Sequence, residues 1–113
     1  MKINNKDYGG FIVSKNILKG HPIKYSYREK CSIPQLNGWH LLSDIDDEEY
    51  INNPNNFIII NADSIYKIAP VMLEIFDAQY GVDLCWLYDD SVLTGFYDLT
   101  KNKEVGIDEI IEE

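Results

Sequence analysis

The carboxylates of residues 44–49 are the densest group of side chains that could bind a metal ion. They are Asp44, Asp46, Asp47, Glu48 and Glu49. Carboxylate oxygens suit calcium or magnesium, but this segment lacks the spacing and the central glycine of an EF-hand loop. Adjacent residues of a helix also point to different faces, so five neighbouring acids do not converge by themselves. The sequence therefore predicts no metal site here.

Two histidines and two cysteines are the other candidates for chemistry. His21, His40, Cys31 and Cys85 are zinc-type ligands, but no two of them stand at ligand spacing. The chain has no Gly-x-Ser-x-Gly elbow, no cysteine in a recognisable catalytic context and no phosphate-binding glycine loop. We therefore expect no enzyme, no catalytic residue and no cofactor, and two free thiols. A small-molecule-binding or metal-binding accessory domain stays open as the alternative.

Charge is distributed unevenly along the 113 residues, whose formal net charge is −9. Residues 1–43 contain seven basic and two acidic side chains, whereas residues 44–113 contain three basic and seventeen acidic ones. A nucleic-acid partner is not expected, because phosphate binding needs a basic face. The acidic half is either a solvated surface or a face for a basic partner. The first residues lack an apolar signal core, and no run is long enough to span a membrane, so we expect a cytoplasmic protein.

The pattern of apolar residues predicts one α+β domain with a mainly antiparallel sheet. We expect about five or six strands and two or three short helices. The strand candidates are residues 11–13, 23–28, 39–42, 57–60, 82–88 and 92–99, of which the last two form a hairpin. The aliphatic run 57–60 is expected to be a central strand buried on both faces. Residues 1–8 are expected to be flexible, residues 9–99 to form the domain, and residues 100–113 to be an acidic tail with a possible short helix.

Several segments taken together resemble a known family. They are residues 11–15, 23–29, 37–43, 47–51 and 54–57, then Ala69-Pro70 before an apolar helix and Tyr80-Gly81 before a strand. The most specific part is Ser14-Lys15, Tyr25 with Tyr27-Arg28-Glu29, Gly38-Trp39 with Ser43, and Glu48-Glu49-Tyr50. From about residue 10 to 90 this order is similar to the bacterial immunity protein thirty-three family. The chain departs from the family pattern at Asp44, where a glycine is common, and the tail from residue 91 matches nothing in it.

The resemblance implies an α+β fold and a role as a cytosolic antidote in a polymorphic toxin system. Such a protein binds and neutralises a cognate toxin and does no chemistry. The candidate partner-binding residues are the steering acids Asp46, Asp47, Glu48, Glu49, Asp89 and Asp90 and the aromatic anchors Trp39 and Tyr50. Arg28 is expected to pair internally with a carboxylate. The sequence makes no prediction of the oligomeric state.

Overall fold

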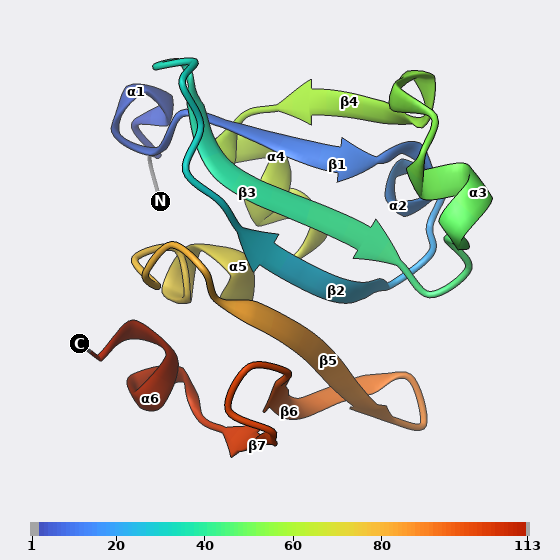
Figure 1. Cartoon of the computed structure of the whole chain (residues 1–113), viewed down its shortest axis with the longest axis vertical. Helices are drawn as coiled ribbons and strands as arrows, with labels where there is room; N and C mark the ends of the chain where they lie inside the picture. Colours follow the sequence, from blue (N-terminus) through green and yellow to red (C-terminus); the bar gives the residue numbers. More distant parts are fainter. Residues whose placement is uncertain (1–2, 113) are drawn as a thin grey trace.

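The computed structural model describes residues 3–112 as one α+β domain built on a single sheet (Figure 1). The expected flexible N-terminus and acidic tail extend beyond these limits, and residues 1, 2 and 113 lie outside the described part. The sheet has the strand order β4-β1-β3-β2-β5-β6-β7. Neighbouring strands are antiparallel except β1 and β3, which run parallel. The prediction of a mainly antiparallel α+β domain is therefore confirmed.

The element count was underestimated, because the described residues contain seven strands and six short α-helices. The strands are β1 (Gly10–Ser14), β2 (Ile23–Arg28), β3 (Leu36–Ser43), β4 (Phe57–Ile60), β5 (Asp83–Asp89), β6 (Val92–Asp98) and β7 (Lys103–Val105). The α-helices are α1 (Asn5–Tyr8), α2 (Lys15–Leu18), α3 (Glu48–Ile51), α4 (Ala62–Ile68), α5 (Val71–Glu74) and α6 (Ile107–Ile111), with a 3-10 turn, η1 (Pro54–Asn56). None of the helices in the described part is long and apolar enough to cross a membrane.

One face of the sheet is covered by helices and contains the core. Alternate residues of β1, β3 and β5 point to this face and are fully or almost fully buried: Phe11, Val13, Trp39, Leu41, Leu84 and Trp86. They pack with Ile65 of α4 and with Met72 and Ile75 in and just after α5. Helix α6 adds Ile110, which is buried in the same cluster as Phe96 of β6 and Val105 of β7. Figure 1 looks onto the opposite face, with α4 behind β1 and β3.

Strand β4 corrects one prediction, because it lies at the edge of the sheet and not at its centre. It pairs with β1 alone, and Ile58 and Ile59 are 41% and 59% exposed. A short run of aliphatic residues marks a strand without alternation, but it does not say how many neighbours that strand has. The run of four apolar residues here belongs to an edge strand, and each of its two faces is only partly covered.

A bulge in β2 decides which side chains of that strand reach the core. Ile23 pairs with Ser43 and Tyr25 with Leu42, so Lys24 is an extra residue in the ladder. The bulge lets Ile23 and Ser26 share the covered face, where the Oγ of Ser26 accepts a hydrogen bond from the Trp86 indole at 2.9 Å. Tyr25 and Tyr27 consequently point to the uncovered face.

The predicted hairpin of the last two long strands is confirmed. Asp90 and Ser91 connect β5 to β6 and both have positive φ angles, of 49° and 66°. This is the twist of a type I′ turn, which suits the right-handed twist of paired strands. The segment expected to be an acidic tail contains β7 and α6, and the one expected to be flexible contains α1.

Gly38 lies inside β3 and not in a turn, although Asn37-Gly38 is a common turn pair. Its φ is +89°, and a Cβ atom at this position would clash with the carbonyl oxygen of Glu29. Only glycine allows the end of β2 to approach β3 this closely. The approach places Arg28 against Asn37.

Candidate partner-binding surface

Most of the predicted steering acids lie at one end of the sheet. Strands β3 and β5 are both antiparallel to β2 and so run in the same direction. Residues 44–49, which follow β3, therefore lie at the same end of the sheet as Asp89, the last residue of β5, and Asp90 (Figure 1). The Asp44 carboxylate acts electrostatically on Tyr88, the residue before Asp89. Burial, with a further contribution from the carboxylate of Asp44, raises the pKa of Tyr88 to about 12. We call this surface the acidic end; its exposed carboxylates are Asp44, Asp47, Glu48, Glu49, Asp89 and Asp90.

Few cations neutralise the acidic end. Among residues 3–112, the one ion-pair contact to its carboxylates is that of His21 with Asp44, at 3.5 Å, and no lysine or arginine lies within 4.0 Å of them. Glu48 and Glu49 lie in the first turn of α3, where the helix dipole favours negative charge. The local potential is therefore negative and open to solvent.

Asp46 holds the backbone in place and is not a free steering charge. Its carboxylate accepts hydrogen bonds from the backbone N–H and hydroxyl of Ser43, at 2.7 and 2.6 Å, and from the side-chain amide of Asn16, at 2.8 Å. Burial alone would raise the pKa of Asp46, but these hydrogen bonds outweigh it and lower the pKa. This residue fixes the turn from which Asp47 caps α3 through the Tyr50 N–H at 2.8 Å.

Because the folded pKa of Asp46 is depressed, its ionised form stabilises the fold above its ordinary pKa, and this stabilisation is lost as the pH falls through the folded value. We expect Asp46→Asn to lower the melting temperature at pH 7 and the gap from the parent chain to shrink below about pH 4. Thermal unfolding followed by circular dichroism between pH 7 and pH 2.5 measures this gap. The exposed variant Asp47→Asn serves as control, and an unchanged gap at low pH would contradict the assignment.

The two predicted aromatic anchors lie in different environments. Trp39 is fully buried, and its indole N–H donates to the carbonyl of Phe76 at 3.0 Å, so the structure excludes it as a surface contact. Its position on the covered face of β3, and not its residue type, decides this. Tyr50 is half-buried and its hydroxyl donates to the carbonyl of Asn56 at 3.2 Å. It stays a candidate at the margin of the acidic end.

The sequence did not single out the uncovered face of the sheet, which we call the open face. Strand register places its side chains in two rows: Ile59, Ile12, His40, Tyr27 and Asp83, and then Leu42, Tyr25, Cys85, Tyr97 and Glu104. Two of its tyrosines, Tyr25 and Tyr97, lie in register on either side of Cys85. The alternation in β2 is the signal that could have located this face, had the bulge been anticipated.

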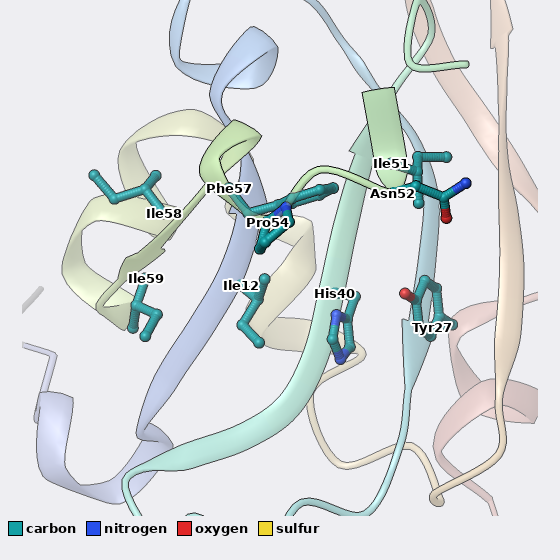
Figure 2. Close-up of a pocket in the computed structure, with 9 residues that line it drawn as sticks. All are labelled: Ile12, Tyr27, His40, Ile51, Asn52, Pro54, Phe57, Ile58 and Ile59. Carbon is teal, nitrogen blue, oxygen red and sulfur yellow. The ribbon is translucent and has the colours of Figure 1, made fainter. Parts of the chain in front are cut away.

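A concavity of about 710 Å³ lies where the open face meets α3 and β4 (Figure 2). It is lined by Ile12, Tyr27, His40, Ile51, Asn52, Pro54, Phe57, Ile58 and Ile59. Tyr27 and His40 stack in parallel with their ring centroids 4.6 Å apart. Burial lowers the pKa of His40 more than Glu29, 4.0 Å away, raises it, so the ring is neutral at pH 7. Burial and the carboxylates of Glu29 and Asp83 raise the pKa of Tyr27, which is also neutral.

In the part of the chain that the structure describes, no three histidine, cysteine or acidic side chains gather as metal ligands would. Cys31 is exposed and Cys85 is half-buried, and both are free. The surface instead combines polarisable rings, aliphatic side chains and unpaired carboxylates. Aromatic side chains are enriched at protein–protein interfaces, whereas exposed carboxylates act mainly at the rim and on the association rate.

Comparison with known proteins gives one match. The family model described as the immunity protein Imm33 domain matches residues 11–94, which span β1 to the first residues of β6. The resemblance noted from sequence segments is therefore confirmed, over nearly the same range. No curated protein and no solved structure matches the chain.

Proposed function

This chain belongs to the Imm33 immunity protein family, and from that premise we propose that it binds a cognate protein toxin in the cytoplasm and neutralises it by occupying the toxin's surface. The observation that carries the proposal is the acidic end, whose carboxylates lack lysine or arginine partners among the described residues. A surface of this kind is complementary to a basic patch. The neighbouring open face supplies apolar and aromatic contact area.

The acidic end would act mainly on the rate of association. Unpaired carboxylates of one sign raise the encounter rate with a basic surface by about ten-fold to a thousand-fold at low ionic strength. Salt screens this attraction over a Debye length of roughly 8 to 10 Å. We therefore propose that Asp47, Glu48, Glu49, Asp89 and Asp90 steer the toxin.

The open face would supply the contacts that keep the complex together. Tyr25 is 37% exposed and lies in register with Cys85, which is followed across the sheet by Tyr97 and Glu104. An aromatic ring beside a carboxylate suits the guanidinium of arginine, which stacks on the ring and pairs with the acid. A basic toxin surface would thus meet both an aromatic ring and a carboxylate on the open face.

Truncating Tyr25 should weaken toxin binding without unfolding the chain. We expect Tyr25→Ala to raise the Kd by roughly ten-fold, since a well-placed interface tyrosine contributes about 1–2 kcal/mol. Tyr66 of α4 is also 37% exposed and lies on the helix side, so Tyr66→Ala is the matched control. Isothermal titration of each variant with the toxin gives the comparison. Equal affinities for the two variants would show that the open face does not contact the toxin.

The proposal itself is tested by titrating the purified chain into the toxin encoded by the adjacent gene, at low salt. We expect a saturable complex of defined stoichiometry. A folded chain that produces no heat and no complex on gel filtration under these conditions would contradict the proposed function.

The concavity of Figure 2 is the observation behind a second candidate, a small-molecule-binding accessory domain. Its lining of isoleucines, Phe57 and a neutral Tyr27–His40 pair suits an uncharged, partly apolar ligand. A thermal-shift screen with nucleotides, divalent metals and small apolar compounds tests it. A ligand at about one hundred times its Kd adds roughly 2.7 kcal/mol of stability. The absence of any shift would leave this candidate without support.

A further inference from the structure

The two edges of the sheet differ in how they are protected. Edge strand β7 contains Lys103 and Glu104, and the following helix α6 packs beside it through the Lys103–Glu109 ion pair at 3.1 Å. Charge and a covering helix are the usual devices that keep an edge from pairing with another chain. Strand β4, at the opposite edge, has neither of them. It offers Phe57–Ile60 with Ile58 and Ile59 largely exposed.

The surroundings of β4 in the sequence are also free of charge. Residues 51–62 contain no acidic, basic or histidine side chain, although the whole chain has a net charge of −9. Two copies of a chain with this net charge repel each other on average. This segment is a place where they can touch without bringing like charges together. A basic toxin, in contrast, would gain no electrostatic advantage from it.

From these observations we propose that β4 pairs with β4 of a second copy of this chain, forming a homodimer with one continuous sheet. Two antiparallel strands related by a two-fold axis perpendicular to the sheet place equivalent faces on the same side. Ile59 points to the open face beside Ile12, since the two are in register. When the two copies of β4 overlap almost fully, only two registers keep open-face side chains opposite each other. In one of them Ile59 lies opposite Ile59 of the second copy, and in the other it lies opposite Phe57. The dimer would extend the apolar floor of the concavity across the axis.

The interface is small, so the association is weak. Four residues span about 13 Å of strand, which is shorter than a standard interface requires. We expect a Kd on the order of 100 µM. Sedimentation velocity from low micromolar to about millimolar chain should show a shift from 13.1 kDa toward twice that mass. Amide exchange of Phe57–Ile60 should slow as the concentration rises.

Ile59→Lys tests the location of the interface, because the side chain is exposed and the change introduces a charge on each side of the axis. We expect it to weaken dimerisation by ten-fold or more. Ile33→Lys is the matched control, since Ile33 is 50% exposed and lies in the loop between β2 and β3, at the other end of the sheet from the acidic end. Circular dichroism confirms that both variants fold.

Four results would overturn the proposal. The first is a chain that stays monomeric at about millimolar concentration. The second is a dimer that Ile59→Lys leaves intact while the amides of β4 remain unprotected, since the copies would then meet elsewhere. The third is a monomeric chain whose toxin binding is lost in Ile59→Lys and kept in Ile33→Lys, since the edge would then belong to the toxin. Toxin binding by a monomer with both variants unaffected also rejects the dimer but leaves the proposed function intact.

Discussion

Replacing Arg28 with methionine should lower the free energy of unfolding by about 3 kcal/mol or more. The guanidinium donates to the carbonyls of Asn37 at 3.0 Å, Phe76 at 2.9 Å and Ala78 at 2.8 Å. The Phe76 carbonyl also accepts from the Trp39 indole and keeps that hydrogen bond in the variant. The carbonyls of Asn37 and Ala78 lose the guanidinium as their donor. Methionine has a similar volume but has no hydrogen-bond donor for these carbonyls.

The same arginine packs between rings. Its Cζ lies 4.6 Å from the ring centroid of Tyr80 and 4.9 Å from that of Phe76. Lysine cannot reproduce the planar fork or the stacking, so Arg28→Lys should recover only part of the loss. For a domain of this size each kcal/mol corresponds to roughly 4 °C in melting temperature, which predicts a fall of roughly 12 °C for the methionine variant.

Chemical denaturation and thermal unfolding of Arg28→Met, Arg28→Lys and Lys30→Met measure this effect. Lys30 is an exposed neighbour. Its replacement removes the same charge but leaves the hydrogen bonds of Arg28 in place. If Arg28→Met were as stable as Lys30→Met, the role assigned to the guanidinium would be wrong.

The second large effect concerns association with the toxin. A triple variant, Asp47→Asn, Glu48→Gln and Glu49→Gln, should lower the association rate by about ten-fold at low salt, because it removes three of the steering charges. Asparagine still caps a helix, so α3 should persist. The dissociation rate should change little if these residues lie at the rim.

A control with the same change in net charge separates local steering from bulk charge. Glu74→Gln, Asp77→Asn and Asp108→Asn remove three exposed acids away from the acidic end. Stopped-flow or surface plasmon resonance at several salt concentrations gives both rate constants. Equal loss in the two triple variants would assign the effect to net charge alone, and no loss in either would contradict electrostatic steering.

Local patterns in the sequence predicted much of the fold. The β5–β6 hairpin followed from the two apolar runs 82–88 and 92–99. This feature is decided by residues close in the chain. The three-residue β7 was missed, because Lys103 and Glu104 carry no strand pattern of their own and are ordered by pairing with β6.

Errors arose where residues far apart in the chain decide the outcome. Arg28 was expected to meet a carboxylate, but among residues 3–112 its partners are carbonyl groups of residues 37, 76 and 78. Phe57–Ile60 was expected to be central, and only the strand order shows that it is an edge. Trp39 was offered as an anchor on its residue type alone, although strand phase buries it.

The candidate partner-binding residues stay predictions, and the structure shows where each of them lies. The sequence identified the acids of residues 44–49 and Asp89-Asp90, and the structure brings both groups to the same end of the sheet. It could not separate Asp46, whose carboxylate is occupied by Ser43 and Asn16, from its exposed neighbours. The open face depends on the register of six strand pairs, and the alternation in β2 indicates it only once the bulge at Lys24 is known.

The central claim is that this chain neutralises a toxin by binding it. Its most direct measurement is the growth of bacteria that express the toxin of the adjacent gene with and without this chain. The account predicts that growth is restored by the parent chain and by Tyr66→Ala, and that Tyr25→Ala needs higher expression for the same rescue. Continued growth arrest while the folded chain accumulates in the cells would contradict the account.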